Sequence, residues 1–196
     1  MKKRSDRAVG RLFTLMGICL IAAAAILLIS WQYGIRSSEQ RASELVQTIR
    51  TIVPEPQNAA PEQRLDNTMP VLSIDGMNFV GILEMPKYGS CFPVCADWDK
   101  FSRYPSRLSG SIYDRSLQIG AATHGGQYDF YREISVGDSV FFTDMEGNRF
   151  SLEITAIRHE KHADQTSLQR EDAALVLFLK NIYSFEYIVI FCDTLG

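Results

Sequence analysis

The pattern of apolar and polar residues separates the first part of the chain from the rest. Residues 12–35 contain no charged side chain, and the apolar stretch Leu12–Tyr33 is 22 residues long. As a helix this stretch would span about 33 Å, which matches the ~30 Å hydrocarbon core of a bilayer. Trp31 and Tyr33 lie at its far end, where aromatic rings favour the membrane interface. We therefore predict a single N-terminal transmembrane helix over 12–35.

Basic residues are concentrated before this apolar stretch. Residues 1–11 contain five Lys and Arg side chains and one acidic side chain, Asp6. Because the more basic flank stays inside the cell, we expect a cytoplasmic tail over 1–11 and an extracellular remainder. A cleaved signal peptide is the alternative, since Ala23 and Ala25 have the form of a cleavage signature. The apolar stretch continues beyond them, which favours the uncleaved anchor.

Residues 36–70 predict a juxtamembrane helix followed by a linker. Apolar residues recur at helical spacing between Ser37 and Ile52, so this helix either continues the membrane span or packs on the following domain. Residues 53–70 contain four prolines among Gln, Asn, Ala and Glu, without an apolar period. This composition is typical of a tether.

From 71 to 196 the pattern changes to short apolar runs separated by turn residues. Residues 145–148 predict a hairpin loop, and residues 128–134 predict one or two helical turns. Many short strands with few helices favour a closed or nearly closed β-barrel, so we expect a mainly β domain over 71–196. The predicted strands are 78–85, 91–96, 116–123, 139–144, 149–158, 173–179 and 187–192.

Composition narrows the classes of function. The 196 residues include 20 Lys and Arg and 23 Asp and Glu, and the formal net charge of −3 argues against a nucleic-acid-binding protein. The contents of 46% hydrophobic and 22% charged residues exclude wholesale disorder. Four cysteines without a CxxC pair argue against a small disulfide scaffold and exclude a zinc ribbon.

Three cysteines, Cys91, Cys95 and Cys192, lie in the predicted extracellular part, where oxidation is possible. On one extended strand Cys91 and Cys95 would be about 13 Å apart, which is too far for a disulfide between them. We therefore expect a free, buried thiol at each of these two positions.

The order of the segments resembles the sortases, which are membrane-anchored cysteine transpeptidases of Gram-positive bacteria. Val80–Pro86 is similar to the opening strand of that family, Phe92–Val94 to its second strand, and Ser116–His124 to the strand that ends in the catalytic histidine. Residues 130–143 and 174–187 resemble later segments. The resemblance implies an eight-stranded closed β-barrel with short helices, in a single-pass protein of the cell membrane whose C-terminal domain is extracellular.

The chemistry of the family needs a Cys nucleophile, a His general acid and base, and an Arg that stabilises the oxyanion or positions the peptide. The resemblance places His124 at the histidine position, Lys180 at the nucleophile position and Tyr187 near the arginine position. Lys180 is not expected to replace the cysteine, because a lysine amine is protonated at neutral pH and would form a stable amide. Cys95 remains as an alternative nucleophile, since Cys192 lies at the far end of the last strand.

Three functions stay open. The first is a sortase-like pseudoenzyme, degenerate and catalytically impaired, that binds a sorting-signal peptide, a pilin or another surface protein, or a partner sortase. The second is an active transpeptidase that attaches surface proteins to cell wall or pilin through a relocated nucleophile such as Cys95. The third is an unrelated, non-enzymatic β-barrel interaction module. No cofactor is expected, and His159 and His162 lack the fixed spacing of a metalloprotease site, so no metal is expected either.

Overall fold

The computed structural model describes residues 3–59, 66–100, 103–123, 133–161, 173–181 and 186–194, without the side chains of 3–15, 31–39, 100, 123 and 181. The chain divides into two compact units, Met1–Ser38 and Glu39–Gly196. Helix α1 (Lys3–Ile52) contributes to both. Within the first unit α1 exposes large apolar side chains, namely Met16, Ile18, Leu20, Ile21, Ile26, Leu27, Leu28 and Ile29.

The membrane segment predicted from the sequence lies in α1. No helix built from the described residues is long and apolar enough to cross a membrane. The transmembrane helix over 12–35 remains a prediction from the sequence.

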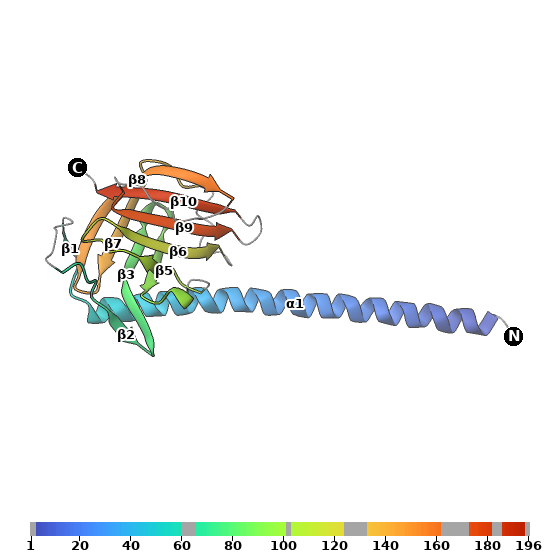
Figure 1. The fold of residues 1–196 in the computed structure, drawn as a ribbon. Helices are drawn as coiled ribbons and strands as arrows, with labels where there is room; N and C mark the ends of the chain where they lie inside the picture. Colours follow the sequence, from blue (N-terminus) through green and yellow to red (C-terminus); the bar gives the residue numbers. More distant parts are fainter. Residues whose placement is uncertain are drawn as a thin grey trace. The chain divides into compact units, whose positions relative to one another are not determined.

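Eight strands of the second unit close into a barrel (Figure 1). Around the barrel the strands follow the order β8, β10, β9, β6, β5, β4, β3 and β7, and β7 pairs with both β3 and β8 to complete the ring. The β6–β9 and β4–β5 pairs are parallel, and the other pairs of the ring are antiparallel. The strands are β3 (Met77–Met85), β4 (Ser90–Cys95), β5 (Ser106–Ser109), β6 (Leu117–Thr123), β7 (Ser139–Asp144), β8 (Asn148–Glu160), β9 (Leu175–Asn181) and β10 (Tyr187–Thr194).

Short elements complete the unit. β2 (Leu72–Ile74) extends β3, and β1 (Gln57–Asn58) pairs in parallel with β8. Two 3-10 helices, η1 (Pro86–Tyr88) and η2 (Trp98–Lys100), follow β3 and β4. The prediction of a mainly β, closed eight-stranded barrel with short helices is therefore confirmed.

Alternation along the strands explains the core. On β9, Leu175, Leu177 and Leu179 point into the barrel, where they pack with Ile188, Ile190 and Cys192 from β10. The residues between them face outward, since successive side chains of a strand point to opposite faces. The long run 173–179 is apolar at every position because a second cluster, which includes Val176 and Phe178, buries the outer face as well.

Each of the seven predicted strands corresponds to an observed strand, with shifts of one or two residues at the ends. The predicted loop over 145–148 is one residue shorter, because β8 begins at Asn148. The Asp144 carboxylate holds this turn by accepting hydrogen bonds from the backbone N–H groups of Glu146 and Asn148. Tyr113 donates a hydrogen bond of 2.5 Å to the same buried carboxylate. The helical turns predicted at 128–134 lie mostly outside the described residues.

The last turns of α1 pack against the barrel. Ala42, Val46 and Ile49, spaced at helical intervals, are at most 5% exposed. They form a cluster with Phe79, Ile82, Cys95 and Tyr104 on the outer face of the barrel. Of the two arrangements expected for the Ser37–Ile52 helix, packing on the domain is thus observed within the second unit.

The described parts of residues 53–70 contact the barrel and do not form the tether that the sequence predicts. Backbone N–H groups of Gln57 and Ala59 donate to the carbonyl oxygens of Gly147 and Arg149, both at 2.8 Å. Met69 is 2% exposed and belongs to the barrel core. Residues 57–59 lie against the barrel because their main chain pairs with β8, a contact that needs no apolar period in the sequence, whereas Met69 contributes a single buried side chain.

The contact between α1 and the barrel can be tested with two isoleucines of the same helix. Ile49→Ala should lower the free energy of unfolding by about 2–4 kcal/mol, because it leaves a cavity under the helix. Ile52→Ala removes the same atoms from a side chain that is 54% exposed and should change it by less than ~0.5 kcal/mol. Chemical denaturation measures both values. Equal losses in the two variants would show that the helix does not pack as described.

Candidate functional site

Three strand ends meet at the position that the sequence assigns to catalysis. β6 and β9 run in parallel with Ala122 beside Lys180 and Thr123 beside Asn181. β10 runs antiparallel to β9, so that its first residue, Tyr187, is the partner of Lys180. His124 follows Thr123 directly in the chain and lies outside the described residues. The structure therefore brings Lys180 and Tyr187 together at the carboxyl end of β6.

The side chains of Lys180 and Tyr187 share the outer face of the barrel. Their neighbours Leu179 and Ile188 point into the core, and alternation places Lys180 and Tyr187 on the opposite face. The Lys180 ammonium lies 6.0 Å from the centroid of the Tyr187 ring, within the range of a cation–π contact. Lys180 is half-buried. It is thus a cation held in place by an aromatic ring.

Aromatic side chains cover the strand surface next to Lys180. The rings of Trp98 and Phe178 are 5.5 Å apart between centroids. A Cβ atom at Gly120 would overlap both rings, so the position between them requires glycine. Trp98 could not be predicted from the sequence, because a lone tryptophan in a short 3-10 helix carries no periodic signal. The outer face of β6 and β9 is consequently apolar and buried at Gly120, Ala122 and Phe178, and cationic at Lys180.

Cys95, the alternative nucleophile, lies elsewhere on the barrel. It is 1% exposed and belongs to the cluster beneath α1. The register runs from Cys95 to Ser106, Gly120 and Phe178, so three strand spacings, about 14 Å around the wall, separate it from β9. The structure does not bring Cys95 to the Lys180 end of β9.

The other cysteines are also placed away from that end. Cys192 pairs with Leu175 at the start of β9, as expected, and lies fully buried inside the barrel, where burial raises the pKa of its thiol. Burial raises the pKa of Cys91 to about 11, although the nearby Arg50 opposes this change. None of the four cysteines forms a disulfide, as expected for Cys91 and Cys95. Neither shifted thiol is an activated nucleophile, because activation requires a lowered pKa.

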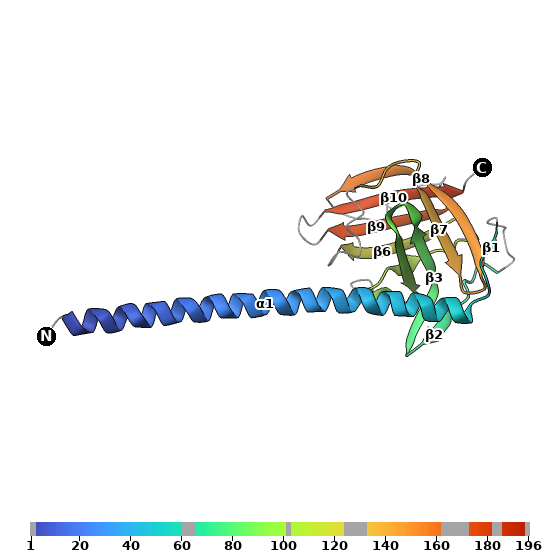
Figure 2. The same ribbon diagram turned by 180° about the vertical axis from the view of Figure 1, so that it is seen from behind.

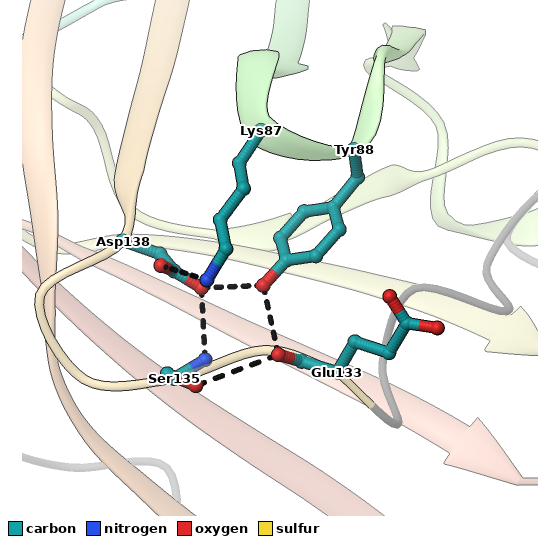
Figure 3. A network of polar contacts seen from close by, with 5 residues as sticks. All are labelled: Lys87, Tyr88, Glu133, Ser135 and Asp138. Carbon is teal, nitrogen blue, oxygen red and sulfur yellow. Dashed lines mark hydrogen bonds and ion pairs between the residues drawn. The ribbon is translucent and has the colours of Figure 1, made fainter.

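A network of polar contacts anchors the segment that leads into β7 (Figure 3). The Asp138 carboxylate accepts hydrogen bonds from Lys87 at 2.7 Å, from the Tyr88 hydroxyl at 2.5 Å and from the backbone N–H of Ser135 at 2.9 Å. The Tyr88 hydroxyl also lies 2.9 Å from the carbonyl oxygen of Glu133. These contacts tie residues 133–138 to η1. Residues 133–138 are the part of the chain that directly precedes β7.

The charges in this network support one another. Burial acts to raise the pKa of Asp138, but hydrogen bonds from Lys87 and Tyr88 outweigh it and lower that pKa. The hydrogen bond to Asp138 raises the pKa of Lys87. Burial, followed by the hydrogen bond to Asp138, raises the pKa of Tyr88. The resemblance covers Asp138 only as part of residues 130–143, and the structural role of this carboxylate lies in its contacts with η1.

Of the two histidines considered for a metal site, the structure describes one. His159 is exposed near the end of β8, and His162 lies outside the described residues. Among the residues that the structure describes, no group of three or more His, Cys, Asp or Glu side chains is placed to hold a metal ion.

Known structures share this arrangement of strands. Sortase A from Corynebacterium diphtheriae superposes with a TM-score of 0.51 at 12% identity, covering 86% of this chain and 92% of that one. Sortase C from Clostridium perfringens SM101 gives 0.52 at 11% identity, with 79% and 89% covered. A sortase D5 transpeptidase from Clostridium perfringens gives 0.51 at 14% identity, with 60% and 79% covered. The barrel therefore has a sortase-like fold.

Sequence comparisons add no further relationship. No protein-family model and no curated protein matches the chain. At these identities the likeness to solved structures concerns the fold, and the chemistry of the site has to be argued from its own residues.

The Asp138 network predicts a pH-dependent contribution to stability. A lowered carboxyl pKa stabilises the fold above the pKa of the unfolded chain and is lost as the pH falls through the folded value. Asp138→Asn should therefore lower the thermal midpoint by a few degrees at pH 7 and hardly change it near pH 2. Calorimetry across this range measures the difference. Asp75→Asn, at an exposed turn, is the control and should show no such convergence.

The raised pKa of Cys91 predicts slow alkylation. At pH 8 its thiolate fraction is small, so iodoacetamide should label it roughly ten- to a hundredfold more slowly than a free cysteine. The rate should continue to rise towards pH 11. Peptide mapping separates Cys91 from the exposed Cys19. Labelling as fast as that of a model thiol would contradict the raised pKa.

Proposed function

We propose that this chain is a sortase-like protein that binds an extended peptide, such as a sorting signal or a segment of a pilin or surface protein, without forming an acyl-enzyme. The observation that carries the proposal is the juxtaposition of Lys180, Ala122 and Tyr187 at one end of a sortase-like barrel. A cation occupies the place where the family resemblance expects a thiol.

The proposal that no acyl-enzyme forms rests on the chemistry of the available groups. Thioacyl transfer needs a thiolate that reaches the peptide carbonyl and a donor that stabilises the resulting oxyanion. Cys95 is covered by α1, and Cys192 lies inside the core. Lys180 is an amine, which gives a stable amide rather than an ester-like intermediate that turns over. Tyr187 offers a single phenol hydroxyl where the family has the five N–H donors of a guanidinium.

Binding is supported by the charge at the carboxyl end of β6 and β9. Lys180 is half-buried there beside the small side chain of Ala122, and its ammonium lies 6.0 Å from the centroid of the Tyr187 ring. A peptide carbonyl or carboxylate is the group that such a cation attracts. His124 is proposed as a further contact by its place in the chain, directly after Thr123.

The proposed location follows from the first unit. We propose that residues 12–35 anchor the chain in the cell membrane with a cytoplasmic tail over 1–11 and the barrel outside. The absence of charge in 12–35 and the basic residues before it support this orientation. The partner would then be a surface protein or pilin presented at the outer face of the membrane, or a sortase that processes it.

The role of Lys180 in peptide binding can be tested with the full-length protein in detergent. Fluorescence anisotropy with a panel of labelled sorting-signal peptides should detect binding, and Lys180→Gln should weaken it about tenfold, the usual effect of losing a charged hydrogen bond. Lys180→Arg should retain it. Lys161→Gln, which removes an exposed charge after β8, should change it less than twofold. Equal losses in the two glutamine variants would indicate general charge attraction and contradict a specific role.

The absence of acyl transfer has a separate readout. Intact-mass spectrometry after incubation with the same peptides should show no adduct on the wild-type chain, while the double variant Lys180→Cys with Tyr187→Arg should acquire one, because it introduces a thiol beside Ala122 and a guanidinium on the neighbouring strand. Lys180→Ser with Tyr187→Arg is the matched control and should acquire none that survives. An adduct on any wild-type cysteine would refute the non-catalytic function and favour the active transpeptidase.

A further inference from the structure

A second site lies on the opposite side of the barrel, in a pocket between the end of α1 and the outer face of β3, β7 and β8. We call it the α1–β7 pocket; its volume is about 320 Å³, and it is lined by Arg50, Val53, Ile82, Glu84, Thr143 and Arg149 together with residues 54–56. In the ring of eight strands β3 is four positions from β9 and β7 is three, so the pocket lies away from the strands that carry Lys180 and Tyr187. Figure 2 shows the end of α1 beside β3.

The walls of the pocket are fixed by main-chain contacts. Val53 N–H donates to the Ile49 carbonyl at 2.8 Å and so continues the helix end. Beyond the prolines, Gln57 N–H donates to the Gly147 carbonyl at 2.8 Å. A Cβ atom at Gly147 would lie 2.9 Å from the Pro54 carbonyl oxygen, so this close approach requires glycine. The segment 53–57 is therefore attached at both ends, and the pocket is part of the folded unit.

Two guanidinium groups flank one carboxylate in the pocket. Glu84 lies between them, 2.5 Å from Arg50 and 3.5 Å from Arg149. The Arg149 guanidinium lies 4.1 Å from the centroid of the Phe141 ring, which holds it in place. Glu55, whose side chain is exposed, also lines the pocket, so its charged lining residues are two arginines and two glutamates. The Cys91 thiol beside Arg50 adds no charge, because burial raises its pKa to about 11.

The floor of the pocket contains a polar group whose hydrogen bond is not made within the protein. Thr143 is 4% exposed, and its hydroxyl oxygen has no hydrogen-bond partner among the described residues. Ile82, Thr143 and Arg149 are register partners across β3, β7 and β8, so the hydroxyl lies between an apolar side chain and a guanidinium. A buried hydroxyl without a partner costs free energy, which a ligand oxygen would offset.

We propose that the α1–β7 pocket binds a small carboxylate with an apolar substituent, about the size of an N-acylated amino acid. The carboxylate lies against Arg149 and Arg50, where two guanidinium groups face one internal carboxylate. The Thr143 hydroxyl donates to a ligand oxygen, and the substituent packs on Val53 and Ile82. The volume is at the lower end of the range for small-molecule sites, which sets the ligand size. The proposal does not depend on the function proposed for Lys180.

The test uses N-acetyl-leucine as the probe and its neutral analogue, N-acetyl-leucinamide. Isothermal titration of the full-length protein in detergent should give a dissociation constant of about 1 mM for the acid, as expected for a ligand of this size. The amide should bind at least about tenfold more weakly, because it lacks the charge that the guanidinium groups recognise. Equal binding of the two probes, or no binding of the acid, would overturn the proposal.

Substitutions distinguish this pocket from other binding on the chain. Arg149→Gln should weaken the acid about tenfold, and Thr143→Val about threefold. Glu84→Gln should instead tighten it several-fold, because it removes the carboxylate that competes for both guanidinium groups. Arg115→Gln is the matched control, since Arg115 pairs with Asp193 at the same 2.5 Å and lies outside the pocket. Unchanged affinity in the Arg149 and Glu84 variants would place the probe elsewhere and refute the proposal.

Discussion

The parallel pairing of β6 with β9 is the constraint on which the arrangement of the site depends. Seven consecutive residue pairs join the strands, from Leu117 with Leu175 to Thr123 with Asn181. Because parallel strands end at the same edge, two points more than fifty residues apart in sequence, Thr123 and Asn181, are brought together. The antiparallel return of β10 then adds Tyr187. Without this register, Lys180 would be an isolated lysine at a strand end.

The strands of the barrel could be predicted where their residues are apolar over several positions. All seven predicted runs became strands, but β5 was missed, because the sequence Ser-Arg-Leu-Ser carries one large apolar side chain, and Leu108 is 38% exposed. β1 and β2 are too short for a periodic signal. The contacts of 53–59 with β8 are made by main-chain atoms, which any sequence provides, and the prolines therefore suggested a free linker.

For the candidate site, the sequence predicts which strand ends meet, but it does not predict the side chains that pack around them. Lys180 and Tyr187 could be paired from the strand pattern and the resemblance alone, since register follows from where two apolar runs end. Trp98, Asp138 and Thr143 could not, because each acts through a contact with an element distant in sequence. Asp138 is an example. It binds Lys87 and Tyr88 of η1, about fifty residues earlier in the chain, and nothing in the local sequence pattern indicates these contacts.

The two proposed sites use the same wall in different ways. At β9 the outer face is buried in an apolar cluster, and the half-buried cation at its end is the group proposed to contact a peptide. At β7 the last turn of α1 and residues 53–56 build a wall over the strands, and the resulting space is limited to a small molecule. The two sites differ in the element that covers the strands. Residues 53–56, first expected to be part of a tether, determine together with the end of α1 which ligands this side of the barrel can accept.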